Sequence, residues 1–157
     1  MKENILLTTS PSTTRQLAQI DGSNDAITCK TDAAWDKNTK TAGFGWVLEG
    51  PPLIAPIHGS ASQSFIGSPL VAEALAMRSA LCMAQTRGIA SLRVFTDNST
   101  LVRAISGKHQ SKEIIGVVHD IRVISSDFAS ISFSYFSRSK NSVADALAKA
   151  SLQFHIL

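Results

Sequence analysis

The sequence predicts an α/β domain in which a mixed sheet of five strands is covered by helices. Three strand-like segments, 27–35, 42–48 and 54–63, follow one another through short polar connections, which is typical of an antiparallel meander. Two later strand-like segments, 91–97 and 131–136, alternate with helical segments, as in units that pair parallel strands. A chain of 157 residues is long enough for one such domain with a real core.

The first two strands each contain an unusual residue. Apolar and polar side chains alternate from Ile27, as on a half-buried strand, but Asp32 is a poor strand former within this run. It is either a water-facing residue at a strand end or a functional one. In the second strand, Gly43 and Gly45 indicate a place where another backbone or a ligand approaches closely.

The clearest helix is predicted over 69–88. Ser68 suits the N-cap, Pro69 suits the first helical position, and Gly88 suits the C-terminal stop. Between them, a buried stripe with helical spacing is expected at Leu70, Ala74, Met77, Leu81 and Ala84.

Three further helices are predicted over 99–105, 114–128 and 142–154. In the last one Val143, Leu147 and Phe154 are expected to point inward. Residues 1–25 lack periodicity and are rich in Ser and Thr, so they are expected to be a flexible lead or linker, with the domain covering 26–157.

Composition narrows the functional classes. The formal charge of +3 permits a nucleic-acid partner without requiring one. No apolar run reaches the roughly 18 residues of a membrane-spanning helix, so no membrane partner is expected. Cys29 and Cys82 are far apart and expected to be buried, reduced thiols. Without a secretion signal, a nuclear or cytoplasmic location is expected.

Four carboxylates occur in separate segments of the chain, and together they could form a binding site for hard divalent cations. Asp32 lies in a strand, Glu73 in the long helix, Asp97 at a strand end and Asp145 at a helix start. Each also has a structural explanation. Asp32 could face water at a strand end, and Glu73 could complement the helix dipole from the first turn. Asp97 could be an N-cap, and Asp145 follows Ser142 in a Ser-x-x-Asp arrangement close to a capping box. Mg²⁺ prefers oxygen ligands and acts on phosphate esters, so phosphodiester hydrolysis is the first hypothesis.

Other site patterns are missing from the sequence. The four histidines, His58, His109, His119 and His155, show no spacing typical of zinc ligands. Residues 43–45 lack the third glycine of a dinucleotide-binding loop, and the chain has neither a phosphate-binding P-loop nor a GxSxG nucleophile elbow.

Five motifs in order resemble those of the type 1 ribonuclease H domain. They are TDAAW at 31–35, AGFGWV at 42–47, AEALAMRSAL at 72–81, FTDNSTLV at 95–102 and RSKNSVADALA at 138–148. The resemblance covers roughly 27–152. It is to the compact version common in plants and related to the reverse transcriptases of non-LTR retroelements.

The resemblance implies a ribonuclease H fold with strand order 3-2-1-4-5 and cleavage of the RNA strand of RNA–DNA hybrids. It implies that Asp32, Glu73, Asp97 and Asp145 bind two Mg²⁺ ions, for which Mn²⁺ can substitute. One ion would activate the attacking water and the other would stabilise the leaving oxygen. Glu73 would also contact a ribose 2′-hydroxyl.

The resemblance also suggests the nucleic-acid contacts, which are Gly43, Asn98, Ser99, Arg138, Lys140 and Asn141. We expect a monomer, either alone or as part of a larger polyprotein with a reverse transcriptase domain. Larger members of the family carry a histidine before the last helix, but residues 136–141 contain none, and the basic handle helix of some members is reduced. The alternative is therefore a catalytically weak or inactive nucleic-acid-binding or scaffold module with the same fold.

Overall fold

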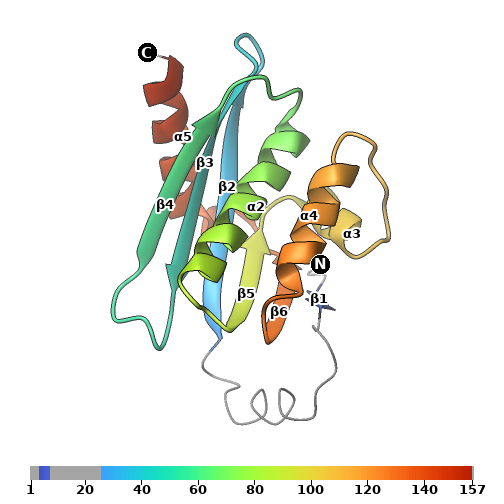
Figure 1. The fold of residues 1–157 in the computed structure, drawn as a ribbon. Coiled ribbons are helices and arrows are strands. Elements are labelled where there is room, and N and C mark those ends of the chain that lie inside the picture. Colours follow the sequence, from blue (N-terminus) through green and yellow to red (C-terminus); the bar gives the residue numbers. More distant parts are fainter. Residues whose placement is uncertain (1–3, 8–25, 157) are drawn as a thin grey trace.

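The computed structural model describes residues 4–7 and 26–156, which form a twisted sheet with helices on both faces (Figure 1). The strands are β1 Asn4–Leu7, β2 Ile27–Asp36, β3 Thr41–Glu49, β4 Ile57–Gln63, β5 Ser91–Thr96 and β6 Ser130–Tyr135. Their order across the sheet is β1-β6-β5-β2-β3-β4. Strands β2 to β4 form the antiparallel meander, and β5 is parallel to both β2 and β6. The predicted order 3-2-1-4-5 is confirmed for the last five strands.

Strand β1 is an addition that the sequence did not predict. Residues 4–7 pair antiparallel with β6, from Asn4 opposite Ser134 to Leu7 opposite Ile131, and lengthen the sheet at that edge. Four residues are too few to show an alternating pattern, so the strand is recognisable only once β6 offers it an edge. The rest of the expected N-terminal lead, 1–3 and 8–25, lies outside the described residues.

The helices form two layers. Helix α2, Pro69–Thr86, packs on β2 and β3, with α3, Ser99–Ile105, and α4, Ile115–Ser125, beside it. Helix α5, Ser142–Ile156, packs on β3, β2 and β4 from the other side of the sheet (Figure 1). A short 3₁₀ helix, η1, Arg138–Lys140, precedes α5.

Helix α2 begins as predicted. The Ser68 hydroxyl oxygen accepts a hydrogen bond from the backbone N–H of Val71 at 3.2 Å, and Pro69 occupies the first turn. The predicted stripe is buried at Ala74, Met77, Leu81 and Ala84, and Leu70 is partly buried. The helix lies between the sheet and α4, so it buries more than one stripe; fully burying a Met or Leu side chain contributes about 1.5–3 kcal/mol.

The predicted inward face of α5 is wrong at Val143 and Phe154, whereas Leu147 is half-buried as its predicted direction requires. Val143 is 47% exposed and Phe154 is 81% exposed, while Ala144 and Ala148 are buried. Helix α5 lies so close to β3 that a Cβ added to Gly43 would come within 2.1 Å of the Ala148 carbonyl oxygen. The glycines therefore make room for the backbone of α5 at Ala144 and Ala148, and the half-buried Leu147 and Leu152 also face the sheet with their Cβ atoms close to the glycines.

Other element boundaries and burials also differ from prediction. Strand β4 begins at Ile57 rather than at 54, and Ile54 is fully exposed. Cys29 is buried, which raises the pKa of its thiol to about 12, whereas Cys82 is exposed on the outer side of α2, contrary to expectation. In the part of the chain that the structure describes, no helix has the length and apolar character needed to cross a bilayer.

Candidate functional site

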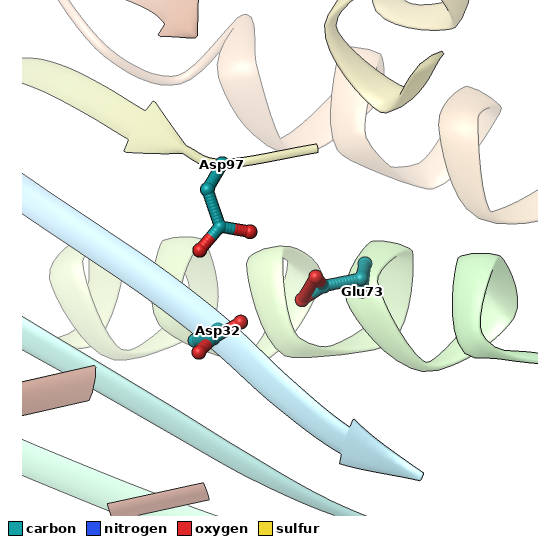
Figure 2. Close-up of side chains that lie close together, drawn as sticks. All are labelled: Asp32, Glu73 and Asp97. Atoms are coloured by element: carbon teal, nitrogen blue, oxygen red, sulfur yellow. The ribbon is translucent and has the colours of Figure 1, made fainter. Parts of the chain in front are cut away.

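Three of the four predicted carboxylates converge in the structure. Asp32 on β2, Glu73 on α2 and Asp97 just after β5 each offer an oxygen, and these oxygens lie within 4.8 Å of one another. Figure 2 shows the three side chains directed toward a common space between the two strands and the helix. Three carboxylates at this spacing form a donor set suited to a hard divalent cation.

The fold explains why these residues meet. Strands β2 and β5 are parallel neighbours, and ligand sites of such sheets gather at the carboxyl ends of the strands. Asp97 is free to face the site because Asn98 takes the N-cap of α3, accepting a hydrogen bond from the Leu101 N–H at 2.9 Å. Glu73 lies beyond the first turn of α2, so the helix-dipole explanation of this residue does not apply.

The carboxylates line a pocket of about 430 Å³ that is also lined by two basic side chains. Asp145 contributes from the start of α5, and Arg138 and Lys149 approach from η1 and α5. Asp145 lies outside the trio whose oxygens lie within 4.8 Å, but it borders the same space. The pocket therefore combines a metal-binding carboxylate cluster with positive charges able to hold a phosphate.

The electrostatics of the cluster are those of crowded, partly buried acids. Burial raises the pKa of Asp32 to about 7, and the Asp97 charge adds to the effect. Burial raises the pKa of Glu73 to about 9, with further contributions from Asp32 and Asp97. The raised pKa values mean that Asp32 and Glu73 hold protons more readily, which lessens the repulsion between neighbouring carboxylates. A bound divalent cation would lessen the same repulsion.

Asp145 behaves differently because cations surround it. Burial acts to raise its pKa, but the hydrogen bond with Lys149, a hydrogen bond from Asp32 and the charges of Lys149 and Arg138 lower it overall. Lys149 Nζ lies 2.9 Å from Asp145 Oδ2, one helical turn further along α5. Asp145 thus stays ionised beside the neutral or cation-bound members of the cluster.

Asn141 has a role that the sequence reading missed. We expected it to contact nucleic acid, whereas in this structure its side chain is fully buried, with 0% exposure. Its Nδ2 donates to the Thr31 carbonyl oxygen at 2.8 Å and to Asp97 Oδ2 at 3.3 Å. The amide thereby ties the start of α5 to β2 and to one of the site carboxylates.

The remaining predicted contacts separate into different places. Asn98 and Arg138 line the carboxylate pocket, whereas Ser99 is exposed on the first turn of α3 and does not line it. Lys140 lines a different groove, on the sheet face beyond α5. Gly43 is buried under α5, so the glycine accommodates this helix and not an approaching hybrid.

Of the pocket residues that were not predicted, Lys149 and Trp35 carry polar groups in their side chains. Lys149 could have been found from its spacing of four residues after Asp145, which places both on one helix face. Trp35 also lines the pocket, with its Nε1 donating to the Ile66 carbonyl oxygen at 2.8 Å and the Lys40 ammonium 4.9 Å from its ring centroid.

Comparison with solved structures finds the same fold in ribonucleases H. RNase H1 from the archaeon Halobacterium salinarum superposes with a TM-score of 0.76 at 22% identity, over 82% of this chain and 98% of that one. The N-terminal RNase H domain of a Mycobacterium tuberculosis protein gives a TM-score of 0.75 at 19% identity, over 84% and 96% of the two chains. LC11-RNase H1 in complex with an RNA/DNA hybrid gives 0.74 at 22% identity, over 83% and 99%.

Sequence comparisons give the family. Comparison with curated protein sequences finds no similar protein. The family model described as reverse transcriptase-like matches residues 30–151, which include all four carboxylates and nearly all of the last five strands and the helices. This chain therefore has the ribonuclease H fold and belongs to the reverse transcriptase-like family.

Proposed function

We propose that this protein cleaves the RNA strand of RNA–DNA hybrids internally, using divalent cations held by Asp32, Glu73, Asp97 and Asp145. The observation that carries the proposal is the convergence of Asp32, Glu73 and Asp97 in a pocket that also presents Arg138 and Lys149. The hybrid found in complex with the similarly folded LC11-RNase H1 supports this choice of substrate.

Each group in the pocket has a task in this reaction. Bound Mg²⁺ would supply Lewis-acid stabilisation of the attacking and leaving oxygens of the phosphodiester. Arg138 and Lys149 would hold the scissile strand through its phosphates. Glu73, at the wall of the pocket, would also accept a hydrogen bond from a ribose 2′-hydroxyl, the group that distinguishes RNA from DNA.

The second candidate is a binding module with little turnover. None of the four histidines lines the catalytic pocket: His109 lines a separate pocket beside α4, and His155 contacts Ser62 and Ser64. Without a nearby histidine, proton transfer would depend on water and on the carboxylates. We therefore expect slow cleavage, with hybrid binding that persists when cleavage is removed.

The test is cleavage of a hybrid whose RNA strand is labelled at both ends. We expect internal cuts in the RNA strand with Mg²⁺ or Mn²⁺ and none with EDTA. Asp97→Asn removes one ligand and is expected to lower the rate by at least 100-fold. Asp127→Asn is the matched control, because Asp127 accepts a hydrogen bond from Gln85 at the opposite end of the sheet.

Three outcomes decide between the candidates. Cleavage of the hybrid but not of duplex DNA or duplex RNA, lost only in Asp97→Asn, supports the enzyme. Hybrid binding by both variants without any cleavage in either metal favours the binding module. Equal cleavage by Asp97→Asn and by the unmodified chain would show that the pocket is not the catalytic site.

A further inference from the structure

The sheet face that carries α5 is only partly covered. Helix α5 packs on β2, β3 and β4, and beyond its first residues the face of β5 carries no helix among those the structure describes. A groove of about 560 Å³ lies there, bordered by Thr28, Lys30, Glu49, Arg93, Phe95, Phe136 and Lys140. We call this surface the open half-sheet.

The open half-sheet carries uncompensated positive charge. Lys30 Nζ pairs with Glu49 at 2.8 Å, so these two charges cancel. Arg93 is exposed and donates to a neutral group, the Ala26 carbonyl oxygen at 3.3 Å. Lys140 is exposed on η1, and no carboxylate among the described residues forms an ion pair with either Arg93 or Lys140. Within residues 26–156, two cations without an ion-pair partner thus border one groove.

An aromatic side chain lines the same groove as the two cations. Phe95 is half-buried on β5 and therefore presents part of its ring to the groove, and Phe136 is buried behind it with ring centroids 5.4 Å apart. The buried ring fixes the position of the exposed one. A partly exposed aromatic ring on an open sheet, flanked by cations, is the arrangement on which unpaired bases stack.

The open half-sheet adjoins the catalytic pocket through one short element. Arg138 lines the pocket and Lys140, two residues later in η1, lines the groove. A nucleic-acid strand that leaves the pocket past Arg138 meets Lys140 next. The two surfaces are therefore continuous, although their lining residues differ.

We propose that the open half-sheet binds single-stranded nucleic acid, with phosphates at Arg93 and Lys140 and a base stacked on Phe95. It is a site separate from the carboxylate pocket and does not depend on cleavage. Its ligand is the unpaired continuation of a hybrid strand or any free single strand, since each offers the same phosphates and exposed bases.

The first test measures binding of fluorescent 20-nucleotide single strands, oligo(dT) and oligo(U), to the full chain by anisotropy. Arg93→Glu with Lys140→Glu is expected to weaken binding about tenfold or more and to reduce the slope of log K against log salt by about 1.4. The matched control is Arg87→Glu with Lys108→Glu, which changes the charge equally at exposed cations on the helical layer of the other face. This control is expected to change binding less than threefold.

The second test locates the base. A single strand carrying 5-iodouridine is irradiated on the protein, and the crosslinked peptide is expected to contain Phe95. Phe95→Leu keeps an apolar side chain and is expected to lose this crosslink while retaining the folded circular dichroism spectrum. Asp97→Asn is expected to bind and crosslink as the unmodified chain does, which separates this site from the proposed catalysis.

Several results would overturn the proposal. Equal weakening by both double variants would mean that binding follows net charge only. Crosslinks confined to the catalytic pocket would place the strand elsewhere. Complete competition by poly-glutamate at equal charge would indicate an acidic polypeptide as the partner, and a dimer that Arg93→Glu dissociates would indicate a second copy of this chain.

Discussion

Replacing Asn141 is expected to damage the fold and the site together. Asn141→Ala removes the hydrogen bonds from Nδ2 to the Thr31 carbonyl oxygen and to Asp97 Oδ2, at a position with no solvent access. Each bond contributes about 1 kcal/mol, and a buried carbonyl left without its donor costs about 1–3 kcal/mol. The Oδ1 atom of Asn141 has no partner among the described residues, so its removal offsets part of this loss.

The expected net destabilisation by Asn141→Ala is about 1–3 kcal/mol. For a domain of this size about 1 kcal/mol corresponds to roughly 3–5 °C, so the melting temperature is expected to fall by about 3–15 °C. Because Asp97 also loses a positioning hydrogen bond, hybrid cleavage is expected to fall by about 10–100-fold below the melting range. Ser139→Ala, on the exposed part of η1, is the control and is expected to change stability by less than about 0.5 kcal/mol.

Asn141→Asp sharpens the test because it keeps the shape and changes the charge. The new carboxylate would place an acceptor against the Thr31 carbonyl and a second negative charge beside Asp97. Its destabilisation is expected to exceed that of Asn141→Ala at pH 8 and to lessen at pH 5, where the introduced group can hold a proton and donate it. Thermal melts of both variants at pH 8 and pH 5 measure this difference in destabilisation. If either variant melts and cleaves like the unmodified chain, the amide does not position Asp97.

Three further predictions concern the carboxylates and the helix above them. The folded-state pKa values of Asp32 and Glu73 are raised to about 7 and 9, so the stability they contribute is fully present below their unfolded values near 4 and is lost as the pH rises through 7 and 9. Melts in EDTA are expected to show this fall, and a smaller one in Glu73→Gln, which has no proton to lose; equal falls in both proteins would contradict the assignment. Mg²⁺ is expected to raise the melting temperature more at pH 8 than at pH 6, because at pH 6 its binding must displace more protons from Asp32 and Glu73. Calorimetry in two buffers of different ionisation enthalpy would measure this proton release, and no release would contradict the prediction. Gly45→Ala would bring a Cβ within 2.3 Å of the Ala144 carbonyl oxygen, so α5 must shift and carry Asp145 with it; we expect a loss of at least 2 kcal/mol in urea unfolding together with reduced cleavage, and an unchanged midpoint would refute the close packing.

The sequence alone determined the elements whose signals are local. Helix α2 begins at Pro69, as Ser68 and Pro69 predict, and α3 matches its predicted range, Ser99–Ile105. Alternation and turn residues identified the five main strands, and the motif order gave their arrangement across the sheet. These features depend on capping, proline geometry and side-chain period, which act within a few residues.

The tertiary structure decided which helix face is buried and which strands pair, because both depend on the neighbouring element. Periodicity placed Val143, Leu147 and Phe154 inward on α5, but the close approach of that helix to the glycines of β3 turns Ala144, Leu147 and Ala148 toward the sheet and leaves Val143 and Phe154 exposed. Strand β1 exists because β6 offers it an unpaired edge, a partner about 130 residues away that no local pattern of four residues can show.

The same division holds within the site. The sequence named all four carboxylates, and the structure decided that Asp32, Glu73 and Asp97 form the tight cluster while Asp145 pairs with Lys149. It also buried Asn141 and directed Lys140 away from the carboxylate pocket, although both are polar and close to Arg138 in the chain. Residue type fixes what chemistry a side chain can perform, whereas burial and direction, which only the packed chain sets, fix whether it reaches the substrate.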